Sequence, residues 1–217
     1  MAKNNITELV FILDRSGSMA GLESDTIGGF NALIDKQRTE PGDACVSTIL
    51  FDNFSQVIHD RIRLDRVPRL TRREYYVRGC TALLDAVGEA ITHIANIHKY
   101  IREEDRPEKT LFVITTDGME NASRCYSYER VRSMIETQKA LYGWEFLFLG
   151  ANIDAAREAA RFGIAPDRAA NYHADHIGTG VLYDAVNETV CNFRASQPMS
   201  AGWKEKIDAD FRKRRKQ

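Results

Sequence analysis

The residues best suited to chemistry stand just after an apolar run near the amino terminus. Residues 9–13 (Leu-Val-Phe-Ile-Leu) are followed by Asp14, and Ser16 and Ser18 come next at alternate positions around Gly17. One carboxylate and two hydroxyls are hard oxygen donors, which suit Mg²⁺ or Mn²⁺ and suit soft metals poorly. Alone, the same spacing is also typical of a turn held by side-chain hydrogen bonds to the backbone. The motif predicts a cation site if further oxygen donors reach it.

Two other segments supply such donors. Thr81 stands in a Gly-Cys-Thr-Ala-Leu segment ahead of a helical pattern, and Asp117 follows a second apolar run, residues 111–116. Continuous apolar runs are typical of strands buried on both faces of a parallel sheet. Open α/β sheets bind ligands at the carboxyl ends of such strands, where the strand order reverses. We therefore expect Asp14 and Asp117 to face each other across one crevice, with Thr81 on the same rim.

Strand and helix patterns alternate along the chain, which predicts a doubly wound α/β fold with helices on both faces of the sheet. Strands are expected at residues 9–13, 44–51, 56–60, 111–116, 144–149 and 169–173. Helices are expected from Ser24 or Asp25, either of which would be the N-cap, to about residue 40, and at residues 83–101, 127–141, 154–162 and 180–193. The strand at 56–60 is predicted to be a short antiparallel hairpin partner of the strand before it.

Length and composition restrict the class of protein. The 217 residues suffice for one sizeable α/β domain and are few for two, so we expect a single domain over residues 1–217. Its core is expected at residues 6–195, with a basic tail or helix at 196–217. The net charge of −1 gives no reason to expect nucleic-acid or membrane binding. Four scattered cysteines and the lack of a long apolar segment predict a cytoplasmic protein with reduced thiols.

The three motifs together resemble a von Willebrand factor A domain, and specifically its metal-ion-dependent adhesion site. Asp14-x-Ser16-x-Ser18, Thr81 in its Gly-x-Thr-Ala-Leu context and Asp117 in Thr-Thr-Asp-Gly match that site at all five positions. The resemblance implies a three-layer, Rossmann-like fold with a mostly parallel six-stranded sheet and one short antiparallel edge strand. It also implies that Ser16, Ser18 and Thr81 ligate Mg²⁺, or alternatively Mn²⁺, directly or nearly so. Asp14 and Asp117 would contribute directly or through water.

A site of this kind can bind a partner through the metal. Serine and threonine hydroxyls add no charge, and a carboxylate one water away neutralises a cation incompletely, so the metal stays electrophilic at an open position. We expect an Asp or Glu carboxylate of a partner protein to fill that position, in a non-catalytic interaction module. Resemblance to intracellular bacterial proteins of this family suggests a partner in an ATPase-containing, stress or defence assembly. The rim around the metal is predicted to include Arg15, Met19, Glu120 and Asn121.

Two other functions are consistent with a metal at this place. An aspartate after the first strand also describes Mg²⁺-dependent phosphatases with an aspartate nucleophile, but these need a second acidic residue two positions on, where this chain has Ser16. The chain also lacks a Gly-Lys-Ser/Thr phosphate loop and a Gly-x-Ser-x-Gly elbow. The second alternative is a scaffold whose metal is purely structural. A nearby carboxylate, Asp52, is expected in a tight turn.

Overall fold

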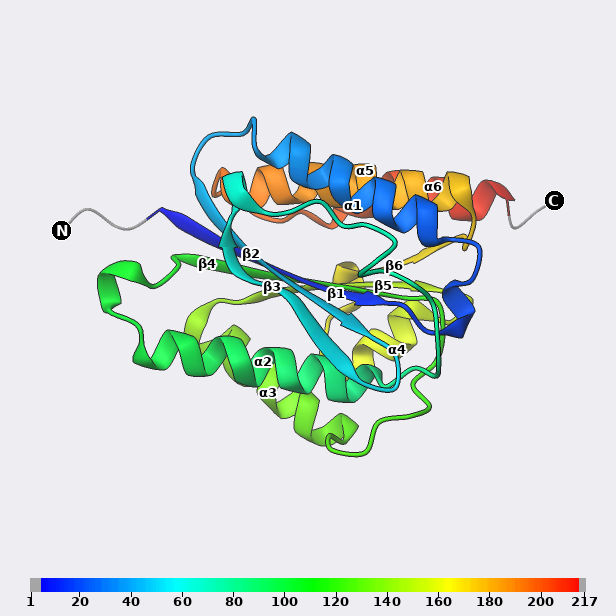
Figure 1. Ribbon diagram of the computed structural model, residues 1–217, viewed down its shortest axis with the longest axis horizontal. Coiled ribbons are helices and arrows are strands. Elements are labelled where there is room, and N and C mark those ends of the chain that lie inside the picture. The colour runs from blue at the N-terminus through cyan, green and yellow to red at the C-terminus, as the bar shows by residue number, and fades with distance from the viewer. Residues whose placement is uncertain (1–4, 215–217) are drawn as a thin grey trace.

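A six-stranded sheet lies at the centre of the protein, between two layers of helices (Figure 1). The structure, a computed structural model, describes residues 5–214. The strands are β1 (Ile6–Asp14), β2 (Asp43–Phe51), β3 (Ser55–Arg63), β4 (Lys109–Thr116), β5 (Glu145–Ala151) and β6 (Ala169–Tyr172). Their order is β3-β2-β1-β4-β5-β6, and every neighbouring pair is parallel except β2 and β3. The predicted doubly wound sheet with one antiparallel edge strand is confirmed.

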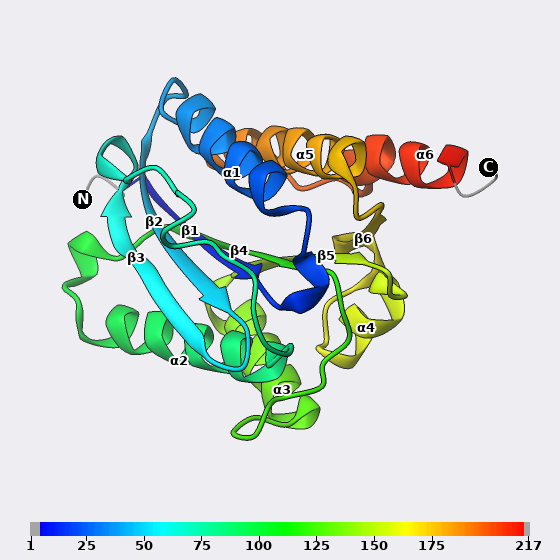
Figure 2. The same ribbon diagram turned by 45° about the vertical axis from the view of Figure 1, so that its right-hand side comes forward.

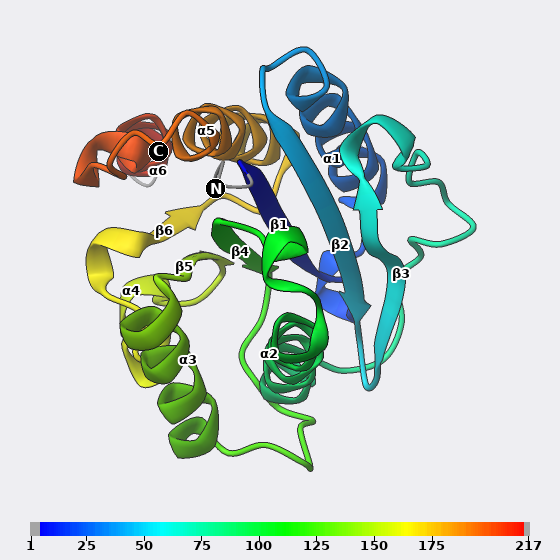
Figure 3. The same cartoon turned by 90° about the vertical axis from the view of Figure 1, so that its left-hand side faces the viewer.

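The helices divide between the two faces of the sheet (Figures 2 and 3). They are α1 (Glu23–Gln37), α2 (Leu83–Tyr100), α3 (Tyr128–Tyr142), α4 (Ala155–Arg161), α5 (His176–Arg194) and α6 (Glu205–Arg214). Helices α1, α5 and α6 cover one face, and α2, α3 and α4 cover the other. The reversal of winding direction between β1 and β4 places the carboxyl ends of these two strands at a topological switch point, where such folds bind ligands.

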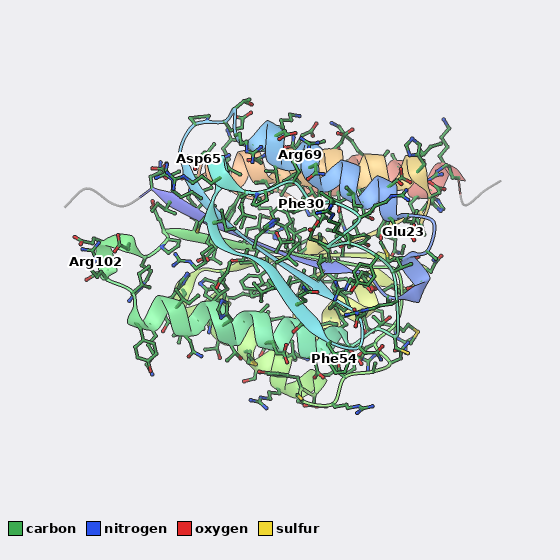
Figure 4. The ribbon with its side chains drawn as sticks, viewed as in Figure 1. Glu23, Phe30, Phe54, Asp65, Arg69 and Arg102 are labelled. Carbon is green, nitrogen blue, oxygen red and sulfur yellow. The ribbon has the colours of Figure 1, made fainter. Side chains whose placement is uncertain are left out.

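The apolar run in β1 packs against both helical layers because successive side chains of a strand point to opposite faces. Phe11 and Leu13 belong to the core under α1 and α5, while Val10 and Ile12 belong to the core over α2 and α3. Phe30 points from α1 toward the sheet (Figure 4), and its ring meets that of Phe11 edge to face at 5.5 Å. Burial on both faces fixes the position at which β1 ends, and so fixes Asp14.

The boundaries of α1, α5 and β3 differ from the predictions. Helix α1 begins at Glu23 after Leu22, so neither Ser24 nor Asp25 is its N-cap. Helix α5 begins at His176, earlier than predicted, because the Asp175 carboxylate accepts a hydrogen bond from Gly178 N at 2.8 Å. Strand β3 is longer than predicted and extends to Arg63, because polar residues are tolerated on an edge strand.

The predicted basic tail is mostly a helix that packs on the protein. In α6, Ile207 is buried in the core and the Phe211 ring stacks on His173 at 4.6 Å. Arg214 forms an ion pair with Asp175 at 2.6 Å, so the segment around His173 holds α6 in place. Residues 215–217 of the predicted tail lie outside the described residues. Within residues 5–214, none of the helices combines the length and the apolar character needed to cross a bilayer.

Candidate metal site

The two carboxylates of the sequence motifs meet at the carboxyl end of the sheet. Asp14 is the last residue of β1, and Asp117 directly follows β4, which lies beside β1. The Asp117 backbone N–H points at Asp14 Oδ2, 3.4 Å away. This edge of the sheet lies at the right-hand end of the strands in Figure 1. Both side chains are buried, so two negative groups share one small volume with little access to water.

Hydrogen bonds fix the Asp14 carboxylate from several sides. Its Oδ1 accepts from Ser16 N at 2.6 Å, and its Oδ2 accepts from the Thr116 hydroxyl at 2.7 Å. Burial raises the pKa of Asp14 above its usual value, and these hydrogen bonds oppose the shift only in part. The Tyr75 hydroxyl donates to the Asp14 backbone carbonyl at 2.5 Å and so holds the strand end from the α1 side.

Three hydroxyls of the motifs form a hydrogen-bonded chain. Ser16 Oγ lies 2.9 Å from Ser18 Oγ, and Thr81 Oγ1 donates to Ser16 Oγ at 3.1 Å. Ser16 and Thr81 are buried, whereas Ser18 is exposed. Adjacent ligands of an octahedral Mg²⁺, with metal–oxygen distances of about 2.1 Å, stand about 3.0 Å apart. The two distances are those of hydrogen bonds and are also compatible with adjacent ligands of such an ion.

Gly118, the residue after Asp117, lies against two of these hydroxyls. A Cβ placed on Gly118 would lie 3.3 Å from Ser18 Oγ and 3.4 Å from Thr81 Oγ1. The loop after β4 therefore passes directly against two of the hydroxyls, and glycine lets it approach that closely. The structure thus brings Asp14, Ser16, Ser18, Thr81 and Asp117 into one cluster.

The loops that carry the hydroxyls are attached to each other through their backbones. Gly17 N donates to Gly79 O at 3.1 Å, and Arg78 N donates to Arg15 O at 2.9 Å. Gly79 has φ of 67°, and a Cβ there would lie 2.0 Å from Asn53 Oδ1, so only glycine fits this position. These contacts set the spacing between Ser16 and Thr81 independently of any ligand.

Two of the four predicted rim residues are buried and two organise the loops. Arg15 and Met19 are 1% and 3% exposed, so both side chains are buried in this structure, and their place in a partner-binding rim stays a prediction. Asn121 holds Thr81, because Thr81 N donates to Asn121 Oδ1 at 2.9 Å and Asn121 N donates to Thr81 O at 3.1 Å. The Glu120 carboxylate accepts four hydrogen bonds, from Leu84 N, Ala122 N, Ser123 N and the Ser123 hydroxyl, at 2.7–2.9 Å.

Sequence reasoning missed Asn152, which follows β5. Its side-chain amide donates a hydrogen bond to Asp117 Oδ1, and its backbone has the left-handed φ of 55°. Burial raises the pKa of Asp117 to about 6; the Asn152 hydrogen bond opposes this shift, and the nearby Asp14 charge adds to it. A usable signal existed, because Asn152 is the first polar residue after the strand next to β4 at the same edge of the sheet.

The cluster has the donor chemistry of a hard cation site. Among residues 5–214, neither Asp14 nor Asp117 forms an ion pair with a lysine, arginine or histidine, so their charge is not neutralised by the protein. The same described residues contain no group of three or more His, Cys, Asp or Glu side chains that could hold a metal. A set of two carboxylates and three hydroxyls differs from such groups, since most of its donors are neutral oxygens. These residues fit Mg²⁺ or Mn²⁺ and would hold it near Ser16.

Comparison with known proteins identifies the fold. No family model and no curated protein matches the sequence. Among solved structures, a von Willebrand factor type A protein from Catenulispora acidiphila matches 86% of this chain and 42% of its own, with a TM-score of 0.59 and 14% identity. Proximal thread matrix protein 1 from the mussel byssus matches 86% of this chain and 46% of its own, with a TM-score of 0.58 and 13% identity. The chain thus spans less than half the length of these proteins.

A further structure of the mussel protein is described as having a zinc-occupied adhesion-site motif. It matches 85% of this chain and 46% of its own, with a TM-score of 0.58 and 14% identity. The fold of the present chain is that of a von Willebrand factor A domain.

Proposed function

We propose that this protein is a metal-dependent protein–protein interaction module, in which Mg²⁺ is held by Asp14, Ser16, Ser18, Thr81 and Asp117. The observation that carries the proposal is the cluster of three hydroxyls, whose successive oxygens lie 2.9 and 3.1 Å apart, and two carboxylates that form no ion pair within residues 5–214. These distances are close to the spacing of about 3.0 Å between adjacent ligands of an octahedral Mg²⁺. Mn²⁺ fits the same donors. A bound cation would supply an electrophilic position for a carboxylate of the partner.

Each group of the chain has a separate part in this function. The fixed hydrogen bonds of Asp14 and the Asn152 amide on Asp117 hold two negative charges in a buried place, which favours a cation there. The hydroxyls of Ser16 and Thr81 are preorganised by the loop contacts around Gly79. Ser18 is exposed, so the open side of the site faces solvent and a partner's Asp or Glu can reach it.

The module is proposed to act without catalysing a reaction. An aspartate-nucleophile phosphatase requires a second carboxylate two residues after its nucleophile, and Ser16 holds that place here. The Ser16 hydroxyl is already within hydrogen-bonding distance of both Ser18 and Thr81. We further propose a cytoplasmic setting and a protein partner that belongs to an ATPase-containing, stress or defence assembly.

A displayed library of random heptapeptides with a fixed central Asp tests this proposal. In about 1 mM Mg²⁺, the protein should capture a subset of these peptides. It should release them when excess EDTA removes the metal. Ser18→Ala should weaken capture, because an exposed ligand is lost with only one hydrogen bond disturbed. Thr39→Ala is the matched control, since Thr39 is an exposed hydroxyl at the far end of α1. Capture that persists undiminished in EDTA contradicts the proposal.

A further inference from the structure

A cavity of about 290 Å³ lies next to the candidate metal site, between the loop after β4 and helix α4. Its walls are Met119, Ile153, Asp154, Arg157, Glu158 and Arg161. Ligand pockets for small molecules measure about 300–1,000 Å³, so this cavity is at the lower end of that range and has room for a single large side chain.

The two apolar walls belong to the segments that hold Asp117. Met119 is two residues beyond Asp117, and its side chain is 61% exposed, which is unusual for a large apolar residue in a loop that is otherwise anchored. Ile153 follows Asn152, the residue that donates to Asp117. Ile153 lies against Gly150, where a Cβ would come within 2.8 Å of its side chain, so the end of β5 leaves space for it. Both apolar walls of the cavity thus belong to short segments whose neighbouring residues are Asp117 and its hydrogen-bond donor Asn152.

The cavity wall carries two acidic and two basic side chains, and one of the basic groups has no ion pair within residues 5–214. The Asp154 carboxylate caps α4 by accepting from Arg157 N at 3.0 Å. Glu158 accepts from the Tyr128 hydroxyl at 2.5 Å and pairs with Arg161 at 3.0 Å, while the Arg161 guanidinium also lies over the Tyr128 ring. Among the described residues, the Arg157 guanidinium forms no ion pair, so it is available to an acidic group of a partner.

We propose that this cavity receives a large apolar side chain of the partner, one or two residues away from the carboxylate that reaches the metal. The proposal rests on the proposed function and specifies its partner as an acidic segment with an adjacent aliphatic or aromatic residue. The distance between the metal site and the cavity agrees with this proposal. Asp117 and Met119 are two residues apart, so their Cα atoms lie at most about 7 Å from each other. A partner segment in extended conformation covers the same span with one or two residues.

Two synthetic peptides test the proposal with the full chain in Mg²⁺. Both carry a central Asp, and one has Leu where the other has Ser at the two positions on each side of the Asp. Burial of the leucine should make the Leu peptide bind about tenfold to a hundredfold more tightly. Met119→Ser alone should reduce that preference, and Met119→Ser with Ile153→Ser should abolish it while the affinity for the Ser peptide stays unchanged.

Leu141→Ser is the matched control, because Leu141 is 68% exposed near the end of α3 and does not line the cavity. It should keep the full preference for the Leu peptide. Equal Mg²⁺-dependent binding of the two peptides by the wild type overturns the inference and leaves the proposed function in place. If neither peptide binds in a Mg²⁺-dependent way, the proposed function fails and the inference falls with it.

Discussion

Arg15 Nε donates to Asp52 Oδ2 at 2.9 Å, and the two side chains are 1% and 2% exposed. Arg15 also donates to Glu74 O at 3.1 Å, and Arg78 pairs with the same oxygen of Asp52 at 2.8 Å. An arginine inside the Asp14–Ser18 run thus attaches that run to the loops after β2 and before α2. Its charge is used within the chain, although its position in the motif suggests a contact with a partner.

Replacing Asp52 by Asn should destabilise the protein by about 3 kcal/mol, because the buried Arg15 charge loses its carboxylate. Urea unfolding followed by circular dichroism measures the change. Arg78→Gln is the control, since Arg78 is 47% exposed and its pair with Asp52 should contribute less than about 1 kcal/mol. Equal losses of unfolding free energy in the two variants would show that the buried pair contributes no more to stability than the exposed one.

The contribution of Asp52 should depend on pH in a defined direction. Burial raises the pKa of Asp52, but hydrogen bonds from Arg78, Phe54 N and Arg15 outweigh it and leave the pKa below its usual value. A depressed pKa stabilises the folded state above the unfolded-state value of about 3.9, and this stabilisation is lost as the pH falls through the folded-state pKa. The stability difference between wild type and Asp52→Asn should therefore shrink as the pH is lowered below about 4. A difference that stays constant over that range speaks against the ion pair.

Asn152 should matter for metal binding and carry backbone strain at the same time. Asn152→Gly and Asn152→Ala both remove the amide that orients Asp117, so both should weaken Mn²⁺ binding by about tenfold. The Gly variant should be more stable than the Ala variant by about 1 kcal/mol, because φ of 55° costs alanine more than glycine. Calorimetric titration and urea unfolding give the two quantities. Wild-type metal affinity in both variants would remove Asn152 from the site.

Glu120 is expected to be structural despite its place beside the site. Glu120→Ala leaves four donors of the loop and of the start of α2 without their acceptor and should cost about 2–3 kcal/mol of unfolding free energy. Glu136→Ala, which removes an exposed pair with Arg132 on α3, should cost less than about 0.5 kcal/mol. If Glu120→Ala lowers the unfolding free energy as little as the control does, Glu120 is not structural, and its predicted role in the partner-binding rim is favoured instead.

The sequence predicted the strand ends well because burial and chemistry change abruptly there. Asp14 ends one uninterrupted, mostly apolar run and Asp117 follows another. Strands of a parallel sheet are buried on both faces, so the first charged residue after such a run marks the end of the strand. Asn152 follows β5 in the same manner, but the strand is predicted to end at residue 149, two residues before its observed end, so Asn152 is not predicted to stand at the strand end.

Tertiary contacts explain the other differences. Leu22 precedes α1, where Ser24 or Asp25 was expected to be the cap, and Leu22 is itself buried in the core. Arg15 looks exposed in sequence because it lies between two polar motif residues, and only the distant Asp52 and Glu74 explain its burial. Partners more than thirty residues away leave no local pattern, so periodicity and capping rules cannot predict them.

The most direct test of the metal site is calorimetric titration of the purified protein with Mg²⁺ and with Mn²⁺. We expect one ion per chain for the wild type and for Thr39→Ala, and at least about tenfold weaker binding for Ser18→Ala and for Asp117→Asn, since each loses one oxygen donor or one charge. Absence of binding by the wild type at millimolar metal, or wild-type affinity in both site variants, would contradict the assignment of these oxygens to a cation.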